Sequence, residues 1–261
     1  MQPQPITISA LEFDVLWEHL GYEDMPLAVK VPSPGATWTE RKQLVAQAWT
    51  ELERRGLGRS VDLNPAVERA LGVLSRPDRE VDGRTWLGRS VRFLAAAREE
   101  DAVLAILADD FVTFHSVPAQ SLASVATGVL APVPAGPGQS VNVRSADFET
   151  AANNAGGTQK GFEQALRNRG IREDDVQALS TMIKDVVATG NFGAAARDKW
   201  GKRHRAERVV AFFDTEDGRY VQVRKPSADG GWTTISPTDT RRLTHQVEQL
   251  LGEIVREAER R

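Results

Sequence analysis

The amino-acid sequence predicts an α+β fold made of two similar halves. Three observations lead to this prediction. Segments with the period of a strand alternate with segments that carry a helical stripe of apolar residues. The order strand, helices, antiparallel strands and helix occurs twice along the 261 residues. One stretch rich in proline and glycine separates the two occurrences, so we interpret residues 1–261 as one pseudo-two-fold domain and not as two independent ones.

The first half, residues 1–130, opens with a strand and closes with a helix. Ile6-Thr7-Ile8 alternates like a strand, and a capping box at Ser9 begins the helix that follows. A second helix is expected over Thr39–Arg55, and a third begins at Asn64-Pro65. An antiparallel meander is predicted next, over Glu80–Leu87, Ser90–Ala97, Ala102–Leu107 and Phe111–Val117, and then a helix over Pro118–Leu130.

Residues 131–138 have the composition of an extended connector and not of a packed element. In the second half, residues 139–261, Val141-Asn142-Val143 alternates as a strand. Helices are expected near Thr158–Arg169 and over Glu173–Ala188. The remaining elements are strands over Arg208–Phe213, Arg219–Arg224 and Trp232–Ile235, and a helix from Pro237 to about Ala258 that Ser236 caps.

The start of the second half matches the start of the first at an offset of 135 residues. Val141-Asn142-Val143 corresponds to Ile6-Thr7-Ile8, and Phe148 corresponds to Phe13. Only the phenylalanine is identical, so chance alternation is an alternative explanation of the match itself. The matching order of elements favours a duplication. Two such halves that share one continuous sheet would protect their strand edges from aggregation.

The composition excludes several kinds of chemistry. The chain has 33 basic and 36 acidic side chains, and this balance creates no global field toward nucleic acid or anionic lipid. It has no cysteine, four histidines, no phosphate-binding loop and no serine elbow, which predicts no cofactor, no metal site and no enzyme. No apolar run reaches the roughly 20 residues of a membrane span. Because Met1–Ile6 lacks the features of a signal peptide, we expect a cytoplasmic protein.

One basic cluster points to a different function. Residues Arg197–Arg208 hold six lysines and arginines together with Trp200 and His204, a pattern that can grip phosphates and stack a base. Asp198 and Glu207 interrupt the cluster, and no known nucleic-acid module accompanies it. A solvated loop or one side of a protein interface is therefore favoured. A nucleic-acid-binding adaptor is the first alternative, and an enzyme of unfamiliar type is the second.

The tryptophans suggest a protein interface. Trp86 falls in the short loop Arg84–Arg89, and Trp200 falls within the basic cluster. Tryptophan and arginine are the residue types that dominate interface hot spots. A loop tryptophan that caps the core is an equally favoured interpretation.

Several stretches resemble a known family. The closest likeness lies in residues 218–223, in residues 230–237 (Gly-Gly-Trp-Thr-Thr-Ile-Ser-Pro) and in the helix start at 239–243. Residues 11–17 and 74–81 are similar as well. In these stretches the chain resembles the EspG proteins of actinobacterial type VII (ESX) secretion. The likeness extends over nearly the whole chain, and its residues belong to the pattern of the fold, not to a catalytic site.

The resemblance implies a cytosolic, non-catalytic chaperone with a central antiparallel sheet and a C-terminal helical bundle. EspG proteins bind the hydrophobic tip of the PPE subunit in a PE–PPE heterodimer, keep it soluble and identify the ESX system that exports it. Here the partner is expected on the exposed faces of Ser90–Ala97, Ala102–Leu107 and Arg208–Arg224, and on parts of a helical region 158–205. The partner-binding residues expected on this basis are Trp86, Arg92, Trp200, Arg203, Tyr220, Gln222 and Arg224.

Two features depart from the family pattern. The loop Arg84–Arg89 is short where some members carry a long one, and the connector 131–138 does not belong to the pattern. The sequence does not decide between a monomer and a weak homodimer.

Overall fold

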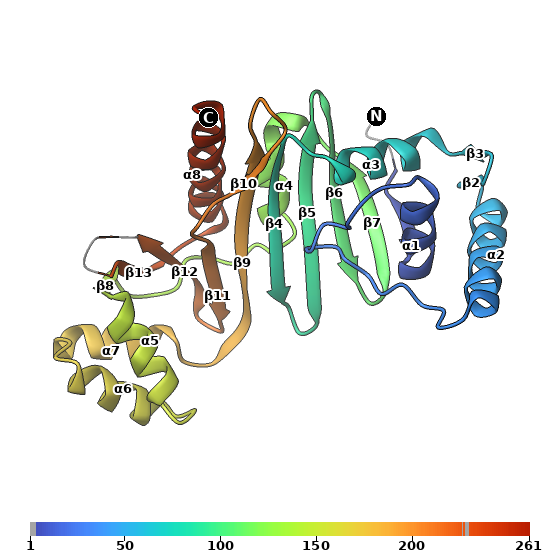
Figure 1. Cartoon of the computed structure of the whole chain (residues 1–261). Helices are drawn as coiled ribbons and strands as arrows, with labels where there is room; N and C mark the ends of the chain where they lie inside the picture. The colour runs from blue at the N-terminus through green and yellow to red at the C-terminus, as the bar shows by residue number, and fades with distance from the viewer. Residues whose placement is uncertain (1–3, 226, 228–229) are drawn as a thin grey trace.

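A computed structural model (Figure 1) describes residues 4–225, 227 and 230–261, so the first three residues of the Met1–Ile6 segment lie outside it. Within the described residues, one antiparallel sheet of eleven strands runs through the molecule. Its strands are β1 (Ile6–Ser9), β4 (Arg79–Trp86), β5 (Ser90–Arg98), β6 (Asp101–Ala108), β7 (Phe111–Ser116), β8 (Val141–Arg144), β9 (Val186–Arg197), β10 (Arg203–Arg205), β11 (Val210–Thr215), β12 (Gly218–Lys225) and β13 (Trp232–Pro237). A separate small hairpin consists of β2 (Gly58–Arg59) and β3 (Asp62–Leu63).

Helices follow the first strand of each half and close each half. They are α1 (Ala10–His19), α2 (Trp38–Arg54), α3 (Pro65–Ser75), α4 (Leu122–Thr127), α5 (Ser145–Asn154), α6 (Gln159–Asn168), α7 (Glu173–Met182) and α8 (Thr240–Glu259). The capping box predicted at Ser9 is present, since its side chain accepts from the Glu12 amide and Glu12 accepts from the Ser9 amide. The α+β class is therefore confirmed.

The strand order shows the pseudo-two-fold arrangement. The order is β1-β7-β6-β5-β4 in the first half and continues β9-β11-β12-β13-β8 in the second, so each half places its first strand at an outer edge. β1 and β8 begin at residues 6 and 141, and α1 and α5 begin at 10 and 145, so both pairs are 135 residues apart. β4 and β9 join the halves as antiparallel neighbours, from Arg79 opposite Ala196 to Trp86 opposite Thr189. The predicted duplication is thus a property of the fold.

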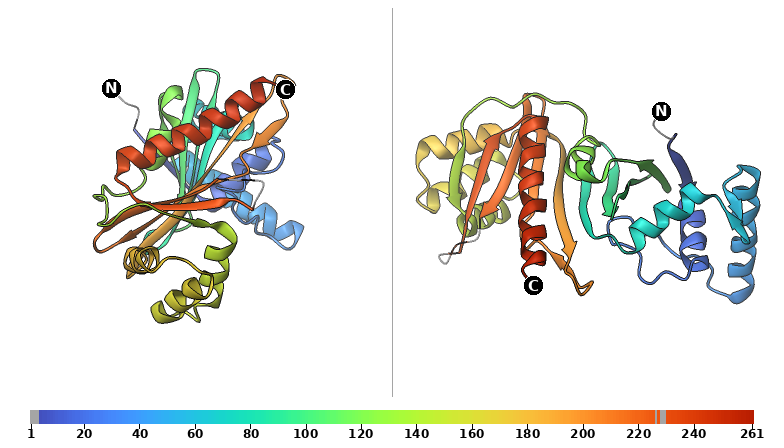
Figure 2. Two further views of the ribbon diagram at one scale, coloured as in Figure 1. Left: turned by 90° about the vertical axis from the view of Figure 1, so that its left-hand side faces the viewer. Right: turned by 90° about the horizontal axis from the view of Figure 1, so that it is seen from above.

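The two faces of the sheet are covered differently. On one face, α4 and α8 pack against each other and on a core to which both halves contribute, including Phe93, Phe192 and Leu243. On the other face, α1–α3 cover the first half and the bundle α5–α7 covers the second, each over its own core. The views in Figures 1 and 2 show these two helical groups at opposite ends of the sheet, with β4 and β9 between them. We call this second side the cleft face.

The largest departure from the sequence prediction is β9. A helix was expected over Glu173–Ala188, but α7 ends at Met182. Asp185 has a φ of 52°, a left-handed conformation that does not continue a right-handed helix. Val186 then begins a strand of 12 residues that pairs with both β4 and β11. The predicted helical region 158–205 is therefore helical only as far as Met182, because long-range pairing overrides the local helical spacing.

The connector 131–138 was predicted to be extended and not packed. It is extended, but it packs against β12. The Arg219 amide donates to the Pro134 carbonyl at 2.8 Å, and the Gly136 amide donates to the Arg219 carbonyl at 3.1 Å. The Tyr220 hydroxyl donates to the Pro137 carbonyl at 3.0 Å. A Cβ at Gly136 would lie 2.2 Å from the Tyr220 ring, so glycine alone permits this approach.

Two helix starts are corrected as well. The segment predicted as a helix over Pro118–Leu130 contains a 3₁₀ turn at Ala119–Ser121 and the short helix α4. The cap of α8 is Asp239 and not Ser236, since its side chain accepts from the Arg242 amide at 2.8 Å. Pro237 ends β13, where it lies opposite Tyr220, so it belongs to the sheet.

Candidate functional site

A cleft of about 420 Å³ opens in the middle of the cleft face, where neither helical group covers β4 and β9. Alternate residues of β4 form its floor, because successive side chains of a strand point to opposite faces. The segment after α1 forms one wall and β10 forms another. Its lining includes residues 24–28, Glu80, Asp82, Arg84, Asn191, Arg197, Arg203 and Arg205.

Two arginines of β10 reach across β9 to carboxylates of β4. Arg203 Nε lies 2.9 Å from Glu80 Oε1, and Arg205 donates to both oxygens of Asp82 at 2.5 and 2.9 Å. Arg205 passes directly over Gly193, where a Cβ would lie 2.2 Å from its Nη2. The absence of a side chain at Gly193 therefore creates the path by which β10 is tied to β4.

These pairs make the floor of the cleft polar and fixed. Glu80 and Asp82 are nearly buried. Burial raises the pKa of Glu80, while the nearby Arg203 guanidinium acts in the opposite direction. The hydrogen bonds that Arg205 donates to Asp82 raise the pKa of Arg205. Two charge-assisted contacts thus join the halves at the pseudo-two-fold junction.

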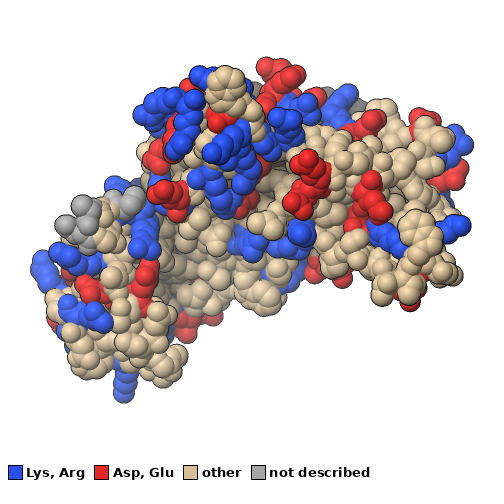
Figure 3. All heavy atoms as spheres, in the orientation of Figure 1, with Lys and Arg blue, Asp and Glu red and all other residues tan. Residues whose placement is uncertain are grey.

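Apolar side chains border this charged floor. Leu27 lines the cleft and is 70% exposed. Trp86 is 55% exposed and lies two residues after Arg84 on the same face of β4. Figure 3 shows basic and acidic side chains side by side over the middle of this face. The cleft face therefore combines exposed apolar side chains with charged ones, and protein-binding surfaces contain both kinds.

Most of the residues predicted to bind a partner lie on the cleft face or at its border. Trp86 is the last residue of β4, not a loop residue, and Arg92 lies on β5 opposite Arg84. Arg203 lines the cleft, and Trp200, which is 78% exposed, lies in the turn between β9 and β10. Gln222 and Arg224 lie further out on the same face, on β12. Their contact with a partner stays a prediction.

Tyr220 lies elsewhere than expected. Its side chain is 1% exposed and stacks on Phe213, with ring centroids 5.2 Å apart. In this structure it is a core residue of the second half and supports the sheet, not an exposed side chain as the prediction required.

Two of the three segments predicted to present an open surface, Ser90–Ala97 and Ala102–Leu107, are covered. On β5, Phe93 and Ala95 pack into the core under α4 and α8, whereas Leu94 and Ala96 pack under α1–α3. The middle of the open surface belongs to β4 and β9, and its floor residues Glu80, Asp82 and Arg84 were not among the predicted site residues. The sequence does contain a pattern that could have located the floor. These charged residues alternate with Val81, Gly83 and Thr85 inside a predicted strand, which places all three on one face of the sheet.

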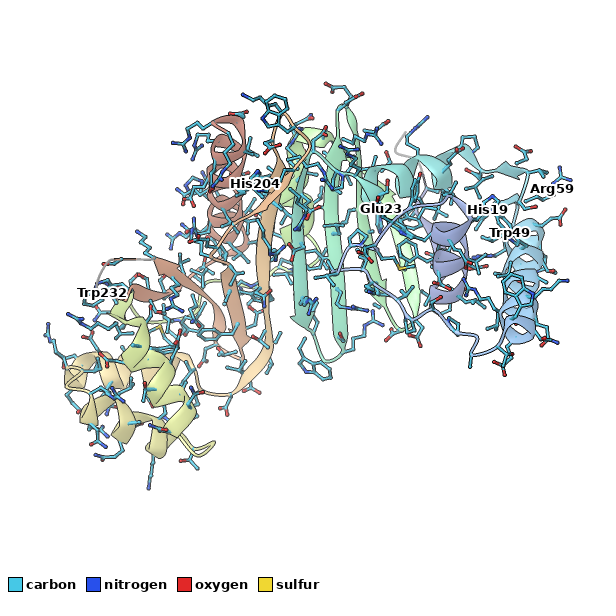
Figure 4. The ribbon with its side chains drawn as sticks, in the orientation of Figure 1. His19, Glu23, Trp49, Arg59, His204 and Trp232 are labelled. Carbon is cyan, nitrogen blue, oxygen red and sulfur yellow. The ribbon has the colours of Figure 1, made fainter. Side chains whose placement is uncertain are left out.

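The basic cluster Arg197–Arg208 is partly neutralised by the fold. Arg203, Arg205 and Arg208 form ion pairs with Glu80, Asp82 and Glu253. His204, labelled in Figure 4, lies on β10 with its Nε2 2.8 Å from Asp198 Oδ2. Half of the six basic side chains are thereby paired with carboxylates, so the segment is a hairpin and not a free basic loop. No observation favours the nucleic-acid alternative.

The residues that line the cleft can be compared with what an enzyme active site would need. The lining contains groups with shifted pKa values, yet no histidine, lysine or threonine, and its one serine, Ser75, donates to the Gly72 carbonyl. The floor carboxylates Glu80 and Asp82 are hydrogen-bonded to Arg203 and Arg205. In the described part of the chain, no three His, Asp or Glu side chains gather as a metal site. None of the described helices is long and apolar enough to cross a membrane.

The fold and the cleft define a pseudo-symmetric α+β scaffold with one open sheet face. The sequence profile of the EspG family matches residues 9–249, so the chain belongs to the EspG family, as the resemblance predicted. Its fold is similar to that of the type VII secretion system chaperone EspG5 of Mycobacterium tuberculosis, solved in complex with a PE25–PPE41 dimer. The TM-score is 0.75 at 19% identity, with 95% of this chain and 96% of that chain covered. No curated protein matches the sequence significantly.

Proposed function

We propose that this chain is a chaperone that binds the PPE or PPE-like subunit of a PE–PPE heterodimer. It keeps that subunit soluble and directs it to a cognate type VII secretion system. The proposal includes a cytoplasmic location and no enzymatic activity. The observation that carries it is the fold, shared over 95% of the chain with EspG5, a chaperone whose solved structure contains a PE25–PPE41 dimer.

The geometry of the cleft face supports this proposal. A hydrophobic helical tip needs an apolar surface with charges around it. Leu27 and Trp86 supply exposed apolar area, and Arg92 and Arg203 supply charge beside it. A specific complex needs roughly 1,200–2,000 Å² of buried area, more than the cleft alone offers, so the flanking strand β12 with Gln222 and Arg224 belongs to the proposed surface.

Co-expression with the PE–PPE pair encoded at the same locus tests the proposal. Size-exclusion chromatography of the purified proteins should show a 1:1:1 complex. Failure to form a complex with any such pair would overturn the proposed function.

A matched pair of tryptophan variants tests whether the partner binds to the cleft face. Trp86→Ser should weaken the complex about 10-fold or more, because a central aromatic anchor contributes strongly to binding. Trp38→Ser is the control, since Trp38 is also exposed but begins α2. Equal affinities of the two variants would place the partner on another surface.

A further inference from the structure

Two arginines on the cleft face form a like-charge pair. Arg84 on β4 and Arg92 on β5 are direct cross-strand partners. Both side chains point to the cleft face, because the neighbouring Gly83 and Phe93 face the core under α4 and α8. Like charges directly opposite each other destabilise an antiparallel pair. The fold therefore holds together two cations that would be better separated.

No acidic side chain compensates this pair within the described residues. Arg84 Nη2 donates to the Leu27 carbonyl at 3.4 Å, and Arg92 Nη2 donates to the Lys30 carbonyl at 3.0 Å. Neither guanidinium forms an ion pair in the described chain, in contrast to Arg203 and Arg205 nearby. A guanidinium carries five N–H donors, so most donors of this pair lack a protein partner there. Burial and the charge of Arg84 both lower the pKa of Arg92.

The surroundings indicate the chemistry of the missing partner. The two carboxylates of the cleft floor, Glu80 and Asp82, are already paired with arginines of β10. Arg84 itself lines the cleft beside the exposed Leu27, and Trp86 follows on the same strand face. A ligand for this place carries one negative, planar group among apolar atoms. An aspartate or glutamate side chain on an otherwise apolar helical segment has this composition.

We propose that Arg84 and Arg92 together accept a carboxylate of the client protein, an Asp or Glu side chain within its apolar tip. Two guanidinium groups can hold one carboxylate through several charge-assisted hydrogen bonds, which fix its orientation as well as its charge. This inference rests on the proposed function and names the contact that would set the register of the client on the sheet.

Binding of the purified PE–PPE heterodimer to arginine variants gives the first test. Arg84→Gln and Arg92→Gln should each raise the Kd about 10-fold or more, since removal of one partner leaves a buried client carboxylate unpaired. The loss should be largest at low salt. Arg59→Gln is the matched control, because Arg59 is an exposed arginine on β2 at the far end of the molecule (Figure 4) and should leave the Kd unchanged. Both cleft variants should unfold at the wild-type temperature or above it.

A second test needs no client. The Nε–H signals of the arginines are followed by NMR during a titration of the free protein with sodium acetate, against sodium chloride at equal ionic strength. The signals of Arg84 and Arg92 should move together and saturate with acetate, while that of Arg59 moves little. Equal movement of all three signals would overturn the carboxylate site.

The two tests separate this inference from the proposed function. If the heterodimer binds wild type and the Arg84→Gln/Arg92→Gln double variant equally well, the chaperone function stands and the carboxylate site is wrong. If no heterodimer binds but acetate saturates the two arginine signals, the carboxylate site stands and the proposed client is wrong.

Discussion

Gly193 shows how one residue shapes the cleft. The backbone of Gly193 has no left-handed conformation that requires glycine, so the requirement is one of space. Any Cβ here would collide with the Arg205 guanidinium and lie 2.9 Å from Asp82 Oδ2. The sequence shows only a glycine in a strand, a pattern typical of a close approach by other atoms. The approaching atoms belong to an arginine 12 residues later, on another strand.

Gly193→Ala is expected to lower the free energy of unfolding by about 1–3 kcal/mol, because the displaced Arg205 leaves the nearly buried Asp82 without its partner. Urea denaturation measures this loss. Gly72→Ala in α3 is the control, since its Cβ meets only the Tyr22 hydroxyl, at 3.5 Å. Alanine in a helix interior should maintain or raise stability. Wild-type stability of Gly193→Ala would contradict the crossing path of Arg205.

The connector 131–138 shows how elements are held together. Arg219 is fully buried, and its guanidinium donates to both oxygens of Asp214, at 2.7 and 2.8 Å. It also donates to the Ala131 carbonyl at 3.0 Å and to Thr240 Oγ1 at 3.3 Å. One side chain of β12 therefore joins β11, the start of the connector and the first turn of α8.

Arg219→Ala should destabilise the protein by about 3–5 kcal/mol, because it leaves Asp214 as an uncompensated buried charge. Arg224→Ala on the same strand is the matched control. Its ion pair with Glu149 is exposed on both sides, so its loss should cost about 0–1 kcal/mol. Thermal unfolding of both variants measures the difference. Similar small losses would show that the connector is held by its backbone contacts alone.

The two halves share a sheet and a core, so we expect the whole molecule to unfold as one unit. β4 pairs with β9 over eight residues, and the core under α4 and α8 includes Val81 from one half and Phe212 from the other. The cleft lies at this junction, with its carboxylates on the first half and their arginines on the second. The site therefore exists only when both halves are folded together.

Unfolding in urea should follow one cooperative transition, with tryptophan fluorescence and far-UV circular dichroism coinciding. Gly190→Val at the β4–β9 junction should move this transition to lower urea as a whole, since even a Cβ would lie 2.8 Å from the Arg84 carbonyl oxygen. Two separate transitions, one for each half, would contradict the single-domain interpretation.

Local patterns were sufficient for much of the fold. The meander of the first half, the capping box at Ser9 and the repeat at Val141–Val143 depend on neighbouring residues, so the sequence shows them directly. The prediction failed at Val186–Ala188, where two valines fit a helical stripe but pair with a distant strand. It also included β5 and β6 in the open surface beside residues 208–224, because periodicity does not show which face a helix from elsewhere will cover.

The chain's own residues therefore specified its α+β class, its duplication and its lack of cysteine, because short-range spacing and composition carry that information. Long-range packing decided that the surface lies on β4 and β9, that Arg203 and Arg205 are occupied and that Tyr220 is buried. Long-range packing also placed Arg84 opposite Arg92, with no acidic side chain paired to either among the described residues. Charge pairing and burial depend on contacts between residues far apart in sequence, which no local pattern records.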